Sequence, residues 1–444
     1  MLAFVALTIG CDDARRATPT PGTPSAAPVA APPEPRTVAP PSSAPSVGAS
    51  AAAPPEDKCR AAPWAMYGHD AARTSAAEGC IRGPLSLVWQ AVYPKTCGFK
   101  FQPGRFLHVI ADDRALYATL DCGHAPALMR ITLAGEVTWT FGRGDYGRGL
   151  WPALYGDDAI VSADDGVFII DRETGKFRFR ELDIWGEPLT VGKSIYVANT
   201  FQLDSAGPFL GAIDDSLRWR WRAAEINPGK GKDVARIGGT ALDGDTIVHA
   251  AAMGRRGIPA LAAFDTASGQ QRWLAEKTFP VSAPSIASGR VFTMEQFVGQ
   301  KGNRLVARSL ADGAVAWSEE VPWARGPSPV LVEKLVVVHT SEGVRAFDQE
   351  SGKLAWSNPT PRKAAAEEAA TSLAAAKGSR TLVVTSGARV VVLEVEGGTE
   401  QWNDAVVRGS SPTSFSGKVV GRPVIVGRSL YISSDGALLR FDAK

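Results

Sequence analysis

Histidine and cysteine are scarce in this chain, which limits the metal sites and catalytic sites that it can hold. Its 444 residues include five histidines and five cysteines. No two histidines stand at metal-ligand spacing on one strand, and the chain has no C-x-x-C, no adjacent cysteine pair and no calcium-loop spacing. A G-x-S-x-G nucleophile elbow is also absent. The sequence therefore supports neither a hydrolase nor a zinc or calcium site, and it predicts no cofactor.

The chain also lacks a strong charge of either sign and a long apolar run. Its net charge is +2, with 21% charged residues, so no nucleic-acid partner is expected. The apolar run of residues 1–10 is too short to span a bilayer, and it is typical of the core of a secretory signal. It ends in LTIGC, which resembles a bacterial lipobox, so Cys11 is the predicted lipidation site and residues 1–11 the signal peptide. An ordinary signal peptide, or a start codon placed too late, is the alternative.

Large apolar side chains are nearly absent from residues 12–57, which consist mainly of Pro, Ala, Ser and Thr. Such a segment cannot bury enough surface to offset its chain entropy, so we expect a disordered tether. A long spacer behind a lipid anchor indicates attachment to a membrane surface. The predicted location is therefore the envelope of a bacterium, on its periplasmic or cell-surface face.

Four cysteines remain after Cys11, and an even number in an exported chain suggests two disulfides. The simplest pairing is Cys59–Cys80 and Cys97–Cys122, although four cysteines allow three pairings. Residues 58–83 form a lead-in segment that the first pair would bracket. Its simplest interpretation is a solvated loop.

Glycine and tryptophan, by contrast, are abundant, and they recur in a repeated pattern. Residues 344–356 read VRAFDQESGKLAW and residues 261–273 read LAAFDTASGQQRW. Each predicts a β-hairpin whose Gly accepts a positive φ angle at the turn. Weaker copies occupy residues 129–139, 168–179, 210–221, 306–317 and 391–402. The chain is thus an array of repeats.

The repeats predict an all-β fold, an eight-bladed β-propeller of four-stranded antiparallel blades over residues 84–444. The expected blades cover residues 106–141, 152–180, 187–222, 239–273, 282–318, 327–357, 371–403 and 422–444. The last unit lacks its Trp-bearing fourth strand, and residues 84–93 (PLSLVWQAVY) supply that strand from the other end of the chain. Closing the ring in this way removes the free sheet edges at its ends. Seven blades is the alternative if the unit containing Cys122 pairs differently.

These hairpins resemble the repeats of pyrroloquinoline-quinone (PQQ)-dependent dehydrogenases, and equally those of the non-enzymatic BamB lipoprotein family. Residues 64–75 (WAMYGHDAARTS) also resemble a segment that precedes the propeller in many exported proteins with such repeats. The positions that fit are Trp64, Met66, Tyr67, His69, Asp70, Arg73 and Thr74. The resemblance implies the fold, but fold alone does not imply activity. The quinone enzymes carry adjacent cysteines and a calcium site, which this sequence lacks.

One group of residues suggests a binding surface. In four units a basic residue stands four positions before the Pro or Thr expected to open a first strand, and these residues are Arg148, Arg236, Arg325 and Arg408. Trp151, Trp185 and Trp323 stand in the same class of loop. Together they predict a partner-binding rim around one mouth of the channel, since Arg and Trp dominate protein interfaces. The alternative is structural: the arginines bond backbone carbonyls and the tryptophans cap the core.

The expected function is a non-enzymatic, lipid-anchored and exported scaffold, monomeric, which binds a protein partner in the cell envelope through this rim. Two alternatives come from other functional classes. One is a PQQ-dependent oxidoreductase, and the other is a binder of small anions or glycans at the channel mouth.

Overall fold

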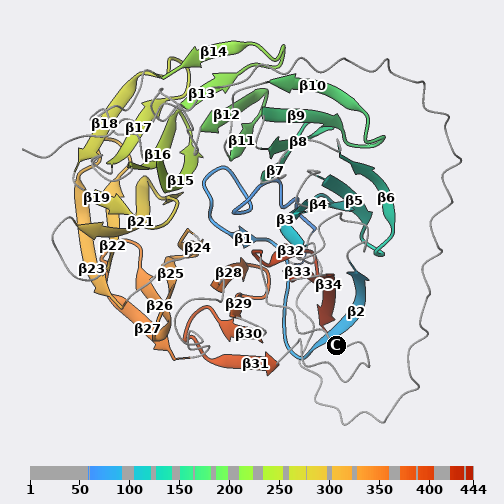
Figure 1. Ribbon diagram of the computed structural model, residues 1–444. Coiled ribbons are helices and arrows are strands. Elements are labelled where there is room, and N and C mark those ends of the chain that lie inside the picture. The colour runs from blue at the N-terminus through green and yellow to red at the C-terminus, as the bar shows by residue number, and fades with distance from the viewer. Residues whose placement is uncertain are drawn as a thin grey trace, which may run out of the picture. The chain divides into compact units, whose positions relative to one another are not determined.

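The computed structural model describes Cys59 and residues 61–92, 105–121, 127–142, 151–163, 166–181, 187–198, 210–223, 234–253, 260–276, 278–297, 303–322, 328–359, 371–386, 389–404, 421–434 and 437–443. These residues form eight antiparallel sheets arranged as the blades of a propeller (Figure 1). Within them, no helix is long and apolar enough to cross a membrane. The predicted eight-bladed, all-β fold is confirmed.

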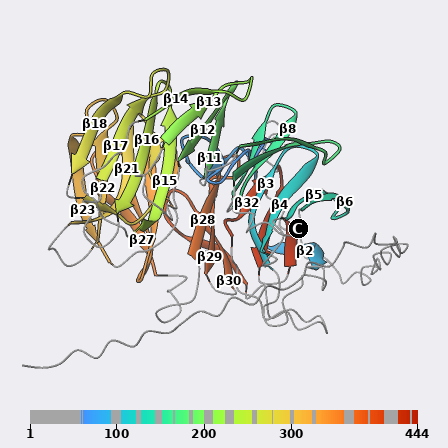
Figure 2. The same cartoon turned by 45° about the horizontal axis from the view of Figure 1, so that its top comes forward.

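In blades 1 to 4, 6 and 7 the four blade strands follow one another in chain order, with the first at the centre of the ring and the fourth outside (Figures 1 and 2). The strands of the first four blades are β3 (Arg105–Ala111), β4 (Ala115–Asp121), β5 (Ala127–Thr132) and β6 (Val137–Phe141) in blade 1; β7 (Trp151–Tyr155), β8 (Asp158–Ala163), β9 (Gly166–Asp171) and β10 (Phe177–Glu181) in blade 2; β11 (Pro188–Val191), β12 (Ser194–Ala198), β13 (Leu210–Ile213) and β14 (Trp219–Arg222) in blade 3; and β15 (Val234–Asp243), β16 (Thr246–Met253), β17 (Ala260–Asp265) and β18 (Gln271–Glu276) in blade 4.

Blade 5 divides its first strand in two, because both β19 and β20 pair with β21. The remaining blades contain β19 (Thr278–Pro280), β20 (Ser285–Ala287), β21 (Arg290–Phe297), β22 (Asn303–Ser309) and β23 (Val315–Val321) in blade 5; β24 (Val330–Val332), β25 (Leu335–Thr340), β26 (Gly343–Asp348) and β27 (Leu354–Asn358) in blade 6; β28 (Thr371–Ala376), β29 (Thr381–Ser386), β30 (Arg389–Glu394) and β31 (Glu400–Asp404) in blade 7; and β32 (Val424–Val426), β33 (Ser429–Ser434) and β34 (Ala437–Ala443) in blade 8.

The fourth strand of blade 8 comes from the other end of the propeller sequence. Strand β2 (Leu85–Val92) pairs antiparallel with β34, from Leu85 opposite Ala443 to Val92 opposite Ala437. Trp89 on β2 then donates a hydrogen bond of 3.0 Å from Nε1 to the carbonyl of Leu133 in blade 1. The predicted closure of the ring is confirmed.

The repeated hairpin joins neighbouring blades. In blade 6 the Asp348 carboxylate accepts hydrogen bonds from the backbone N–H and the hydroxyl of Ser351, at 2.8 and 2.7 Å. Gly352 follows with a φ angle of 73°, and a Cβ atom added there would lie 2.7 Å from Cδ2 of Trp317 in blade 5. The D-x-x-[ST]-G pattern therefore makes a turn without a side chain, against which the tryptophan of the preceding blade packs.

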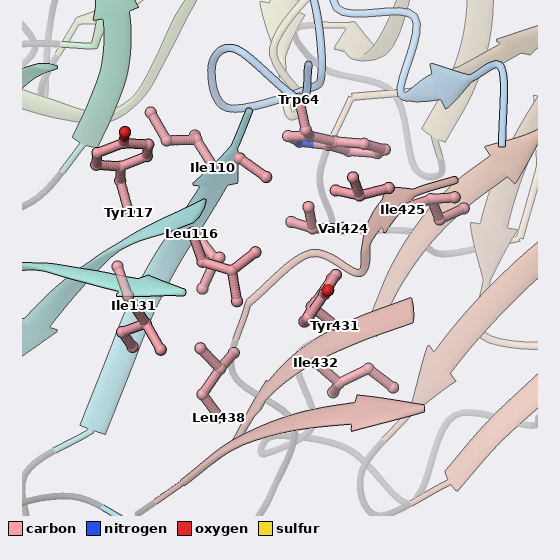
Figure 3. Packing of buried hydrophobic residues seen from close by; sticks show 14 of the residues in the cluster. Trp64, Ile110, Leu116, Tyr117, Ile131, Val424, Ile425, Tyr431, Ile432 and Leu438 are labelled. Carbon is pink, nitrogen blue, oxygen red and sulfur yellow. The ribbon is translucent and has the colours of Figure 1, made fainter. Parts of the chain in front are cut away.

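A large buried cluster fills the junction between blades 1 and 8 (Figure 3). It includes Ile110 and Leu116 from blade 1, and Ile425 and Tyr431 from blade 8. Trp64 of the lead-in segment belongs to the same cluster and is 1% exposed. The lead-in segment is therefore part of the core, and not the solvated loop that its composition suggested.

Candidate functional site

The lead-in segment lies at the centre of the ring, among the first strands of the blades (Figures 1 and 2). It hydrogen-bonds the backbone of seven blades through Trp64–Ala111, Ala65–Leu154, Ala71–Leu242, Ala72–Ile286, Thr74–Leu331, Ser75–Ala375 and Cys80–Gly427. Its strand β1 (Ala76–Ala77) also adds in parallel to β28. The segment reaches blade 3 through an ion pair between Arg73 and Glu187. One short stretch of chain thus contacts every blade.

A disulfide closes the lead-in segment. Cys59 and Cys80 are bonded, as the sequence predicted. Cys97 and Cys122, the other predicted pair, lie outside the described residues, as does the predicted lipidation site Cys11.

Arg73 carries a positive charge into the centre of the ring. Its side chain is fully buried. Its Nε donates to the carbonyl of Thr240, and its Nη1 donates to the Glu187 carboxylate and, at 3.2 Å, to the carbonyl of Tyr67. Its Nη2 has no hydrogen-bond partner among the described residues. Burial raises the pKa of Glu187, and the Arg73 guanidinium opposes that rise.

Arg422 brings a second guanidinium to the same place from the start of blade 8. It is 4% exposed and donates from Nη1 to the hydroxyl of Ser75. Its guanidinium carbon lies 4.7 Å from the ring centroid of Tyr67, and that of Arg73 lies 5.9 Å from the same centroid. Nε and Nη2 of Arg422 have no hydrogen-bond partner in the described part of the chain. Tyr67 therefore lies within reach of two buried cations.

Two histidines and a tryptophan complete the surroundings of this cluster. The rings of Tyr67 and His108 lie edge to face at 4.9 Å, and those of His108 and Trp151 are stacked at 6.3 Å. Burial, together with the charge of Arg422, lowers the pKa of His108 to about 4. Burial also lowers the pKa of His249 to about 4, again with an arginine, Arg73, adding to the effect. Both imidazoles are therefore neutral at pH 7.

Acidification is expected to destabilise the fold through His249. The pKa of His249 is about 4 in the folded chain, against an ordinary value of 6.5. Between these values the unfolded chain binds a proton that the folded chain does not, so stability falls as the pH drops through this window. The loss attributable to His249 should reach about 2 kcal/mol by about pH 5.

Urea unfolding at about pH 7 and about pH 5 measures this loss. The variant His249→Asn should lose about 2 kcal/mol less than wild type between the two pH values. Comparing the difference between the two pH values, and not the stability at one pH, removes any effect of the substitution that does not depend on pH. Equal pH dependence in His249→Asn and wild type would contradict the assignment.

The predicted partner-binding rim is only partly described. Trp151 is the half-buried first residue of β7, and not a loop residue, because it already pairs with Ser162. Arg236 lies within β15, ahead of Thr240, so Thr240 does not open that strand. β32 begins at Val424, well beyond Pro412, the residue from which Arg408 was counted. Arg148, Trp185, Trp323, Arg325 and Arg408 lie outside the described residues.

Sequence reasoning did not identify the central cluster as a site. Arg73 and Tyr67 belong to the motif of residues 64–75. That motif indicated a segment that precedes the propeller, but it did not predict that the segment lies at the centre of the ring. Arg422 directly precedes the Pro423 that opens blade 8, so a search for arginine immediately before such a proline would have found it. Glu187 stands in the corresponding place, directly before the Pro188 that opens blade 3, while no sequence signal distinguishes His249.

The centre does not suit a quinone cofactor bound with calcium. Calcium takes six to eight oxygen ligands, whereas Glu187 is the carboxylate that the described residues bring to this cluster, and it is bonded to Arg73. The described residues contain no group of three His, Cys, Asp or Glu that could hold a metal ion.

Comparisons with known proteins agree with the fold. A family model described as outer membrane protein assembly factor BamB matches residues 260–444. The assembly factor BamB of Yersinia pestis is 26% identical over 201 residues, which are 43% of this chain and 50% of that protein. The chain thus matches about half the length of this curated relative.

Solved structures cover more of the chain at lower identity. BamB from Moraxella catarrhalis is 16% identical, with a TM-score of 0.55 over 82% of this chain and 98% of that one. The quinohemoprotein alcohol dehydrogenase from Comamonas testosteroni is 13% identical, with a TM-score of 0.56 over 86% of this chain and 81% of that one. Identities this low show the fold alone. The chain is a propeller of PQQ-like repeats that resembles the BamB family.

Proposed function

We propose that this chain is a non-enzymatic scaffold of the bacterial envelope, which binds another envelope protein. It is exported, anchored through a lipid on Cys11 and held away from the membrane by the tether of residues 12–57. It acts as a monomer. The similarity to an outer membrane protein assembly factor supports the location and the role as a binding protein.

The observation that carries the proposal is the lead-in segment at the centre of the ring. Its backbone bonds connect successive first strands, and its Trp64 is buried between blades 1 and 8. These contacts at the axis of the propeller hold the blades together and make the ring stiff. A stiff ring presents its loops in fixed positions, which lowers the entropy lost when a partner binds.

The partner is proposed to bind the rim of Arg148, Trp151, Trp185, Arg236, Trp323, Arg325 and Arg408. Aromatic and Arg side chains supply most of the binding energy at protein interfaces. Clustered arginines also favour a partner whose contact surface is acidic, because complementary charge increases the association rate.

Cross-linking in intact envelopes followed by purification tests the rim. The variant has Arg148, Arg236, Arg325 and Arg408 all changed to Glu. One envelope protein should be recovered with wild type and lost with this variant. Circular dichroism must first show that the variant is folded.

The matched control changes four exposed lysines in the turns of blades 2, 3 and 6 to Glu, namely Lys176, Lys193, Lys334 and Lys353. It alters the net charge by the same amount and should still recover the partner. Equal recovery with wild type and the rim variant would refute binding through the rim arginines. Loss with both variants would indicate a general charge effect, which also contradicts the proposal.

A further inference from the structure

Two buried guanidiniums at the centre of the ring share one buried carboxylate among the described residues, while the ionised Asp70 of the lead-in segment is 36% exposed and accepts hydrogen bonds from Thr74. Arg73 and Arg422 are both buried, while Glu187 is the carboxylate bonded within this cluster. His108 and His249 are neutral at pH 7 and cancel no charge. Leaving a buried guanidinium without a counter-charge is strongly unfavourable. An anion at this position would give the second guanidinium a buried counter-charge.

The free atoms of Arg422 have the geometry that binds oxyanions. Nε–H and Nη2–H lie on one edge of a guanidinium and point the same way, so together they bind two oxygen atoms. The chain uses this edge elsewhere: Nε and Nη2 of Arg308 bond the two oxygens of Glu295 at 3.0 and 2.9 Å. Arg380 bonds Glu333, and Arg440 bonds Asp442, through the same two atoms. In Arg422 this edge has no partner among the described residues.

Other unpartnered donors belong to the same buried cluster. Nη2 of Arg73 and the hydroxyl of Thr240 have no hydrogen-bond partner in the described part of the chain, and each residue is at most 1% exposed. Arg73 bonds the carbonyl of Thr240, and both arginines lie against Tyr67. Buried donors are almost always satisfied in native proteins. These atoms therefore indicate a ligand rich in acceptor atoms.

We propose that the axial cluster binds one small dissolved oxyanion, a carboxylate or a phosphate, through the Nε–Nη2 edge of Arg422. Arg73 supplies the second positive charge. The depth of the cluster restricts the ligand to a small one, because both guanidiniums are at most 4% exposed. This site goes beyond the proposed scaffold function, and none of its proposed anion-binding atoms belongs to the rim, although Trp151 of the rim stacks on His108 beside it.

Calorimetric titration of the intact exported chain tests the proposal, with inorganic phosphate in one arm and acetate in the other. Chloride at equal ionic strength serves as the reference. One of the two oxyanions should bind saturably with a stoichiometry of one, and it should raise the thermal unfolding midpoint. The arm that responds identifies the ligand as a phosphate or a carboxylate.

Two variants at Arg422 distinguish the edge from the charge. Arg422→Gln removes both, while Arg422→Lys keeps the charge but lacks the two-atom edge. Both should bind the anion about 10- to 100-fold more weakly than wild type. Arg380→Gln, which alters an exposed guanidinium paired with Glu333 and Glu396, is the matched control and should bind like wild type.

The anion titration of the wild-type protein can refute the proposal by itself, so the test does not depend on whether the variants fold. If neither phosphate nor acetate binds or stabilises wild type beyond chloride, the site does not exist. If the anion binds wild type and Arg422→Gln equally, Arg422 is not its ligand. The scaffold proposal is tested separately, because recovery of an envelope partner depends on the rim variants.

Discussion

Changing Glu295 to Ala should lower the free energy of unfolding by about 3–5 kcal/mol. Glu295 on β21 is fully buried and bonds Arg308 through both of its oxygens, at 3.0 and 2.9 Å. The hydroxyl of Thr293 donates a further hydrogen bond to it at 2.7 Å. Removing the carboxylate leaves the Arg308 guanidinium, which is itself nearly buried, without a counter-charge. Urea denaturation at pH 7 measures the loss.

An exposed ion pair in the same blade provides the control. Glu320 contacts Arg304 at 2.9 Å, but 81% of the Glu320 side chain is exposed. Glu320→Ala should therefore cost less than about 1 kcal/mol. The double variant Glu295→Leu with Arg308→Met should recover most of the stability, because a well-packed apolar pair can replace a buried ion pair. A cost for Glu295→Ala no larger than that for Glu320→Ala would show that the buried pair does not stabilise blade 5.

Changing Trp356 to Ala should also lower the free energy of unfolding by about 3–5 kcal/mol, because it leaves a cavity where the indole packs between blades 6 and 7. Trp356 on β27 is 8% exposed, and its Nε1 donates to the carbonyl of Val395 at 2.8 Å. Its ring covers the turn of blade 7, where a Cβ on Gly398 would lie 2.3 Å from Cε3 of the ring. Thermal and urea unfolding should both report the loss.

Leu354 lies two residues earlier on β27 and is 52% exposed. Leu354→Ala should change stability by no more than about 0.5 kcal/mol, which makes it the matched control. Trp356→Phe keeps most of the ring but leaves the Val395 carbonyl without its donor, so it should cost about 1–3 kcal/mol. If Trp356→Ala and Leu354→Ala had equal effects, the repeated tryptophan would not hold neighbouring blades together.

The fold could be predicted because each repeat contains, close together in sequence, the residues that form its turn and those that pack against the neighbouring blade. Asp348, Gly352 and Trp356 stand within nine residues, and each has a local or neighbouring-blade role that recurs along the chain. The predicted and observed limits of the blades differ by only a few residues. Blade 4, for example, was expected at residues 239–273 and spans residues 234–276. The Ala-rich residues after 371 form the buried strand β28 despite their helix propensity, because packing in the sheet overrides it.

The central cluster could not be predicted in the same way. Arg73 meets Glu187 across 114 positions and Ser75 meets Arg422 across 347 positions, so no spacing rule connects them. The rim prediction assumed that one four-residue offset marks one position in every blade. The assumption fails in blades 4 and 8. In blade 4 the first strand begins before Arg236, and in blade 8 it begins well after Pro412.

The position of residues 61–92 at the start of the propeller sequence determines the order in which this protein can fold. Strand β2 pairs with β34, the last strand of the propeller in sequence order, and the lead-in segment bonds blades 7 and 8 as well as the earlier blades. The first strand of blade 8 to be synthesised, β2, therefore waits for nearly the whole propeller sequence before its partner exists. Contacts across such sequence distances make folding slow, since loop-closure entropy is lost before they form. The propeller therefore cannot close before blade 8 has been synthesised.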